Sequence, residues 1–315
     1  VGGVFVDFLS WRFAFVVNVI PIGVVLWLLR VLGHQNSRRA GVRIDYPGAI
    51  LATAGLGGVV FALIEQGSLG WGSPAIWGPL AGGVLSFAGF LVRELFAAEP
   101  IMPLDLFRVR NFWTGNVATA FIYGALSLSS FAIGVYLQEG PGLPATLAGI
   151  ASLPSTIIMI AFSSRVGAWA GRLGPRLFMT VGPIVCGAGV LTMLLVRSDF
   201  DYWWQMLPGI VIFGIGLTLT VSPLTSAILG AIEPERSGIA SAVNNAVSRV
   251  AGLIVTAMLG LITGGALDLD GFHRTVVVMA ALLVAGGLVS FAGIRDHLSR
   301  GNARSQPEAS QAAPS

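Results

Sequence analysis

Nine stretches of predominantly apolar residues run along this chain, each about as long as a helix that crosses a lipid bilayer. A membrane helix needs about 20 such residues. Only 10% of the 315 residues are charged, whereas soluble domains carry roughly 25%, so no soluble fold of this length could hide the apolar surface. The sequence predicts an all-α integral membrane protein with about nine transmembrane helices, at roughly 13–32, 48–65, 75–93, 113–137, 145–165, 177–196, 205–230, 238–263 and 274–294.

The arginines gather at one set of loops and helix ends. Fourteen of them fall on one side of the predicted topology, three on the other, and Arg249 lies inside a span. Because cytoplasmic loops carry an excess of basic residues, the arginine-rich side and the C-terminus of this multi-pass cell-membrane protein are predicted to be cytoplasmic. Topology explains the basic charge, so we expect no nucleic-acid partner. The fourteen are Arg30, Arg38, Arg39, Arg43, Arg93, Arg108, Arg110, Arg165, Arg172, Arg176, Arg236, Arg295, Arg300 and Arg304.

The chain opens on a short apolar run at residues 1–6 and ends on a polar tail. The opening run has no basic lead and is too short for a signal peptide. We interpret it as the outer end of an earlier helix, and we therefore expect the chain to be the C-terminal part of a longer protein. The polar residues 295–315 are expected to be a disordered cytoplasmic tail.

The sequence contains none of the residue patterns that we searched for as signs of enzymatic chemistry. The three histidines lie in loops or the tail without metal-ligand spacing, and Cys186 stands alone. Neither a Gly-x-Ser-x-Gly nucleophile elbow nor a phosphate-binding Gly-x-x-x-x-Gly-Lys loop is present. We expect a protein that is not an enzyme and that uses no cofactor and no metal.

Several short motifs, in their order and spacing, resemble those of the major facilitator superfamily, and more narrowly its fourteen-span drug:proton antiporters. In that family a Gly pair ends the fifth span and a Ser-Trp-Arg…Asn…Pro-x-Gly run opens the sixth. The resemblance covers nearly the whole chain to about residue 295. The matching segments here include Gly2-Gly3, Ser10-Trp11-Arg12-Phe13, Asn18-Val19-Ile20-Pro21-Ile22-Gly23, Asp45-Tyr46-Pro47-Gly48, Gly70-Trp71-Gly72, residues 103–112 and Gly238-Ile239-Ala240-Ser241-Ala242.

This resemblance implies a division of the chain and a function. Residues 1–32 would be the end of the fifth span and the sixth span of the N-terminal bundle, 33–112 two central linker helices with their loops, and 113–294 the C-terminal six-helix bundle. The family moves small lipophilic or cationic substrates out through the lipid membrane, by alternating access driven by protons. Because such sites lie between two repeats, we expect this chain alone to be inactive.

Arg249 is the most unusual residue of the predicted spans. A charge near the bilayer centre costs at least about 2.5 kcal/mol, so it should face the bundle interior or a wet cavity. Asn245 lies four residues earlier, on the same helix face. The pair is predicted either to line a substrate cavity, or to tie this helix to a carboxylate in the bundle, or to be a structural polar tether.

Three further polar residues are candidates for a substrate pathway. Asn18 precedes Pro21, which removes a backbone hydrogen bond and bends the first helix. Thr220 and Ser222 belong to a polar run around Pro223 in the seventh span. For all three the alternative is a hydrogen bond to their own helix backbone.

A second motif is expected in a cytoplasmic loop. Residues 167–176 resemble the superfamily's Gly-x-x-x-Asp-Arg-x-Gly-Arg loop, with Gly171 where that motif has Asp. The glycines allow a tight turn and the arginines can bridge to helix ends or carboxylates. The gating candidates are Gly167, Gly171, Arg172, Gly174 and Arg176; the alternative is a tight turn whose arginines only set topology.

Proton coupling usually needs an ionisable residue within the membrane. No carboxylate lies deep in the nine predicted spans, so we expect the proton relay outside this chain. Two other functions stay open: export of lipids or cell-envelope precursors by a member of the same superfamily, and a membrane interaction protein that transports nothing.

Overall fold

The computed structural model describes residues 2–31, 45–97, 100–233 and 236–296. All regular elements within these ranges are helices. In chain order they are α1 (Gly2–Phe8), α2 (Phe13–Val16), α3 (Val19–Val31), α4 (Tyr46–Leu69), α5 (Pro74–Phe96), η1 (Leu104–Arg108), α6 (Arg110–Glu139), α7 (Ala145–Ala151), α8 (Leu153–Leu173), α9 (Pro175–Thr192), η2 (Met193–Leu195), η3 (Tyr202–Met206), α10 (Leu207–Leu229), α11 (Ser237–Ala257), α12 (Leu259–Thr263) and α13 (Leu269–Gly293).

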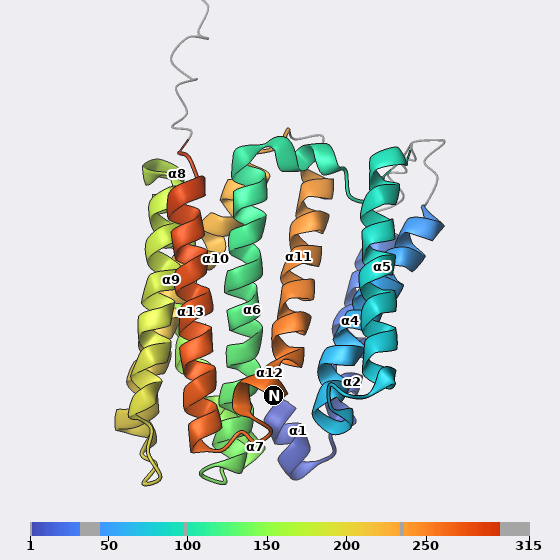
Figure 1. Ribbon diagram of the computed structural model, residues 1–315. Helices are drawn as coiled ribbons and strands as arrows, with labels where there is room; N and C mark the ends of the chain where they lie inside the picture. Colours follow the sequence, from blue (N-terminus) through green and yellow to red (C-terminus); the bar gives the residue numbers. More distant parts are fainter. Residues whose placement is uncertain (1, 32–44, 98–99, 234–235, 297–315) are drawn as a thin grey trace, which may run out of the picture.

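The prediction of nine membrane-length helices is confirmed within the described residues. The observed helices extend past several predicted ends; α4, for example, runs over Tyr46–Leu69 against the predicted 48–65. Figure 1 shows the long helices side by side, with α5, α8 and α13 finishing at the same end of the bundle. We call this the arginine-rich end and its counterpart the opposite end.

The core lies among α6, α9, α10 and α13, which pack on one another. Their contacts need small residues, since membrane helices associate largely through close backbone approach. At Gly189 of α9, a Cβ atom would stand 2.5 Å from the backbone nitrogen of Phe213 in α10. The backbones of α9 and α10 therefore lie so close at Gly189 that a side chain at this position would not fit.

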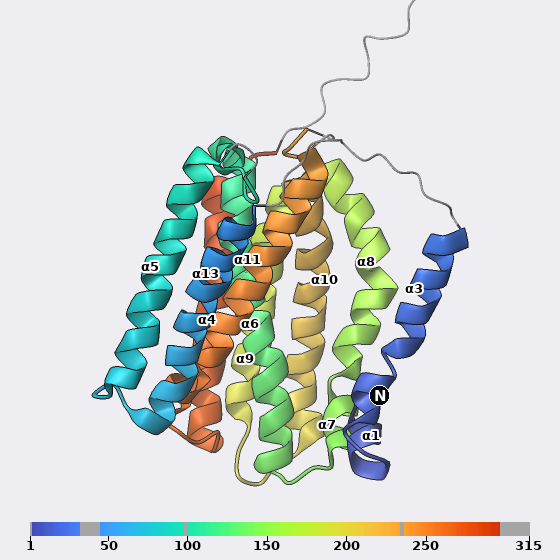
Figure 2. The ribbon, with the colours of Figure 1, turned by 90° about the vertical axis from the view of Figure 1, so that its right-hand side faces the viewer.

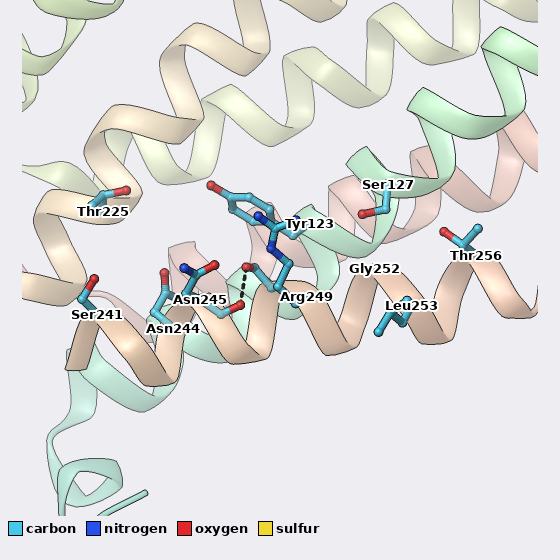
Figure 3. A pocket seen from close by; sticks show the side chains of 11 residues that line it. Tyr123, Ser127, Thr225, Ser241, Asn244, Asn245, Arg249, Gly252, Leu253 and Thr256 are labelled. Carbon is cyan, nitrogen blue, oxygen red and sulfur yellow. Dashed lines mark hydrogen bonds between the residues drawn. The ribbon is translucent and has the colours of Figure 1, made fainter. Parts of the chain in front are cut away.

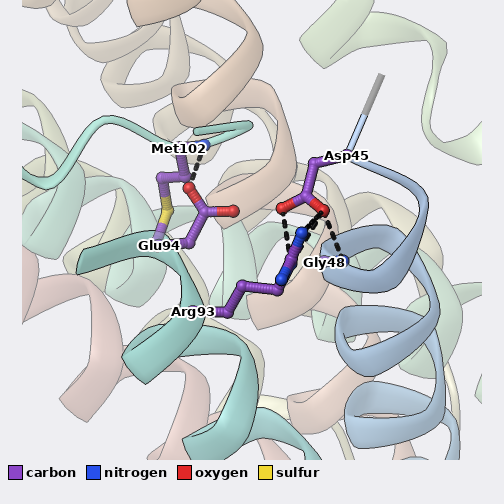
Figure 4. A network of polar contacts seen from close by, with 5 residues as sticks. All are labelled: Asp45, Gly48, Arg93, Glu94 and Met102. Atoms are coloured by element: carbon purple, nitrogen blue, oxygen red, sulfur yellow. Dashed lines mark hydrogen bonds and ion pairs between the residues drawn. The ribbon is translucent and has the colours of Figure 1, made fainter. Parts of the chain in front are cut away.

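The α4–α5 hairpin is a second packing unit, and α4 rests against α11. Asp45 starts α4 by accepting the backbone N–H of Gly48, and Nε of Arg93 donates to its two carboxylate oxygens at 2.7 and 3.0 Å (Figure 4). The hydrogen bond from Arg93 holds the pKa of Asp45 below its usual value. Beside this pair, the buried Glu94 accepts the N–H of Met102. The hairpin is thus closed by charge at its arginine-rich end.

The first helical segment stands at the margin of the bundle (Figure 2). The predicted span 13–32 is divided into α2 and α3 at Val17–Asn18, one turn before Pro21, and α3 buries none of its residues. By contrast, α1 packs on α7, where Asp7 accepts the N–H groups of Ala145 and Thr146. The contact to the bundle is therefore made by α1 at the opposite end.

Candidate functional site

A polar cavity of about 640 Å³ opens between α6, α10 and α11. We call it the polar pocket. Figure 3 shows its side chains projecting from these three helices toward a common space. The described residues of its lining include no aspartate and no glutamate; they are Tyr123, Ser127, Thr225, Ser241, Asn244, Asn245, Ser248, Arg249, Gly252, Leu253 and Thr256.

Helix α11 supplies most of this lining because its polar and small residues recur at helical spacing. They fall three or four residues apart, from Ser241 to Thr256, and so share one face. The opposite face is apolar. It borders a second cavity of about 650 Å³, which we call the apolar groove, together with α4, α5 and α6. The residues of α11 on that side are Ala242, Val243, Ala246, Val247, Val250, Ala251, Ile254 and Val255.

Arg249 lies in the polar pocket with an exposed side chain. It forms no hydrogen bond and no ion pair with any residue that the structure describes, whereas Arg93 and Arg236 each pair with an aspartate. Tyr123 of α6 lines the same pocket. Asn245, the second residue predicted from the sequence, lines the same pocket, so the structure brings the two together.

Asn244, next to Asn245 in the sequence, makes hydrogen bonds to another helix. Its amide donates to Oδ1 of Asn116 at 3.2 Å and to Oγ1 of Thr119 at 2.8 Å, both on α6. These bonds tie α11 to α6 beside the polar pocket. Sequence reasoning missed this clamp and Tyr123. The signal was present as polar residues at 116, 119, 123 and 127, which follow a helical period along an apolar span.

The other predicted pathway residues lie outside the lining of the polar pocket. Asn18 donates to the carbonyls of Ala14 and Phe15 in its own segment. Thr220 is fully buried and donates to the carbonyl of Gly216 on its own helix. Ser222 borders Gly167 of α8. Their part in a pathway stays a prediction.

The expectation of a loop over residues 167–176 is wrong for most of that segment. Helix α8 continues through Gly167, Gly171 and Arg172 to Leu173, and α9 begins at Pro175. Two glycines four residues apart lie on one face of a continuing helix and need not make a turn. The whole connection is Gly174, whose φ of 89° is a left-handed value that favours glycine.

Arg176 does bridge to a helix end, as the motif suggests. Its guanidinium donates twice to the carbonyl of Phe291, near the end of α13, and its backbone N–H donates to Asp296. From α6, Arg110 donates to the carbonyls of Ala292 and Gly293. These contacts hold α6, α9 and α13 together within one bundle. Arg172 is exposed, and its role in gating stays a prediction.

A third contact at the arginine-rich end joins η1 to the start of α11. Arg236 donates to both carboxylate oxygens of Asp105, at 2.7 and 3.0 Å. This hydrogen bonding holds the pKa of Asp105 below its usual value. The pair is half exposed, so it fixes the entry to α11 more than it stabilises the fold.

Comparison with known proteins adds a family and several relatives. Residues 1–256 match the family described as Major Facilitator Superfamily. The chain is 35% identical over 268 residues to the cephamycin export protein CmcT of Amycolatopsis lactamdurans, which covers 84% of this chain and 55% of that protein.

Two further relatives are equally informative. One is the tetracenomycin C resistance and export protein of Streptomyces glaucescens, 30% identical, with 83% of this chain and 49% of that protein covered. The other is the multidrug resistance protein Stp of Mycobacterium tuberculosis, 30% identical, with 82% and 48% covered. The chain spans about half the length of these curated relatives.

Proposed function

Because the chain belongs to the Major Facilitator Superfamily, we propose that it serves the export of small drug-like molecules across the cell membrane, with the polar pocket on the transport pathway. One observation carries this proposal. A polar cavity of about 640 Å³, within the size range of ligand sites, is held inside apolar membrane-length helices. The names of the relatives, two export proteins and a multidrug resistance protein, support the same class of cargo.

The finer parts of the proposal follow the sequence resemblance. We place the chain among the fourteen-span drug:proton antiporters, with the arginine-rich end in the cytoplasm. Residues 113–294 would be the C-terminal bundle, and the packing of α6 to α13 supports that boundary. Residues 33–112 would be the central linker helices, supported by the self-contained α4–α5 hairpin. Proton coupling stays a prediction, because none of the described residues that line the polar pocket is a carboxylate.

The apolar groove favours a second candidate function, the export of a lipid or cell-envelope precursor. It is lined almost entirely by alkyl and aromatic side chains of α4, α5, α6 and α11. Such a surface suits an acyl chain rather than a polar drug. The two candidates therefore assign the cargo to opposite faces of α11.

Adjacent residues of α11 provide a matched test. Asn245 lines the polar pocket and Ala246 lines the apolar groove, and both are exposed. The whole protein, expressed in cells, would carry Asn245→Trp or Ala246→Trp, and accumulation of the neutral fluorescent dye Nile red would be measured. If drugs pass through the polar pocket, Asn245→Trp abolishes efflux and Ala246→Trp retains it.

The converse result decides against the polar pocket. Efflux that survives Asn245→Trp and is lost with Ala246→Trp would move the pathway to the apolar groove. Equal efflux by both variants, at wild-type protein levels in the membrane, would remove the polar pocket from the pathway.

A further inference from the structure

The charge balance of the polar pocket identifies the class of ligand that it suits. Among the described residues of the lining Arg249 is the one that is charged, so this part of the chain gives the pocket a net charge of +1. The other residues that line it are neutral. A cationic ligand would meet repulsion there, whereas an anion would neutralise a guanidinium that lacks a partner among the described residues.

Hydrogen-bond donors surround the guanidinium. Tyr123 offers a hydroxyl that forms no hydrogen bond to a described residue, and Asn245 offers an amide. Figure 3 shows both side chains near Arg249. A guanidinium presents two parallel N–H groups, a geometry that matches a carboxylate. The amide of Asn244 already donates to Asn116 and Thr119 of α6. The donors that remain for a ligand are therefore those of Arg249, Tyr123 and Asn245.

Apolar surface lies within the same pocket. Leu253, one turn beyond Arg249, is 56% exposed, and the Tyr123 ring of α6 lines the same pocket. A ligand that places an anionic group on Arg249 can therefore lay an apolar body along these side chains. A small inorganic anion would leave that surface uncovered.

We infer that the polar pocket binds amphiphilic carboxylates, with the carboxylate on Arg249 and the apolar body against Leu253 and Tyr123. This inference rests on the proposed function and narrows its cargo. It replaces the expected preference for cationic compounds with a preference for anionic ones. The competing arrangement is an Arg249 that pairs with a carboxylate elsewhere in the whole protein, in which case no ligand anion is needed.

Three probes separate these arrangements in the wild-type protein. Fusidate is a steroid carboxylate, its methyl ester has the same body without charge, and ethidium is a permanent cation. Binding to the purified whole protein would be measured by quenching of tryptophan fluorescence. We expect fusidate to bind about 10–100-fold more tightly than the ester, as for charged hydrogen bonds. Equal affinity for acid and ester would overturn the inference.

Variants assign the preference to one residue. Arg249→Gln should weaken fusidate binding by about the same factor and leave the ester unchanged. Arg249→Lys keeps the charge without the paired N–H groups and should give an intermediate ratio. Arg165→Gln is the matched control, since Arg165 is exposed on α8 outside the pocket. An acid-to-ester ratio that is unchanged in both Arg249 variants contradicts the inference.

The same probes distinguish failure of this inference from failure of the proposed function. If ethidium and the ester are exported and blocked by Asn245→Trp, but fusidate gains nothing from Arg249, only the preference for carboxylates fails. If none of the three probes responds to Asn245→Trp, the pocket is not on the pathway and the proposed function fails with it.

Discussion

The close approach of α9 and α10 gives a sharp prediction about stability. In Gly189→Ala, the new methyl group would lie 2.5 Å from the backbone nitrogen of Phe213 and 2.9 Å from the carbonyl oxygen of Gly209. Both are backbone atoms, so no side chain can turn away and the helices must separate. Overpacking of this kind costs about 1–3 kcal/mol. Alanine regains about 0.5–1 kcal/mol of helix propensity, so with an overpacking cost of about 2 kcal/mol, the middle of that range, the net loss is about 1–1.5 kcal/mol.

Gly187→Ala is the matched control, two residues away on the same helix. There the new methyl group faces α13 and comes no closer than 3.4 Å, to a methyl of Val284. That is an ordinary contact, and the variant should be unchanged or up to about 1 kcal/mol more stable. The two substitutions differ only in which neighbouring helix the added atom meets.

Cys186 reports the opening of this interface. It is the single cysteine of the chain, it is fully buried on α9, and its Sγ lies 3.5 Å from the carbonyl oxygen of Phe213. A fluorogenic maleimide can react with it only after local opening. In detergent, Gly189→Ala should react about 5–12-fold faster than wild type, at about 1.4 kcal/mol per tenfold. A reaction no faster than that of Gly187→Ala would refute the packing argument.

Three other substitutions test single contacts. Asn244→Ala removes two bonds to α6 and should lower the free energy of unfolding by about 0.6–2 kcal/mol in chemical denaturation. In Asp45→Asn, the free energy of unfolding of the α4–α5 hairpin should be lower than in wild type at neutral pH, because the ion pair with Arg93 is lost. Because Arg93 lowers the pKa of Asp45, this deficit should vanish as the pH falls well below about 3.9, since wild type then protonates the same group. Gly174→Ala forces a non-glycine residue to a φ of 89° and should cost about 1–3 kcal/mol in thermal unfolding, whereas Gly171→Ala, with open space around it, should not.

The sequence predicted the features that depend on local pattern. Apolar runs define the nine spans because lipid demands about 20 apolar residues at each crossing. Arg249 and Asn245 were identifiable because a charge within such a run has few structural uses. The division of the first span before Pro21 agrees with the missing N–H of that proline.

Features that depend on distant partners were not predictable. Asp7 binds N–H groups of residues 138 and 139 positions away, and Asn244 binds side chains more than 120 positions away. No local pattern encodes such distances. The loop at residues 167–173 was mispredicted because glycine permits both a turn and the close packing of a helix. Here α8 meets α10 at Gly167 and Ser222, so packing decides the outcome.

The helices differ in how deeply they are buried. Half of the α6 and α9 spans is buried, against 17% for α8 and α11. The well-buried helices α6, α9 and α13 are also joined at the arginine-rich end by Arg110 and Arg176. They should therefore move as one rigid body, as packed cores do. Helix α11 lies outside this joined group, anchored at Asn244 and at its entry. It can therefore carry a lone charge on one face and an apolar groove on the other, and changes on either face should alter the cargo before they alter the fold.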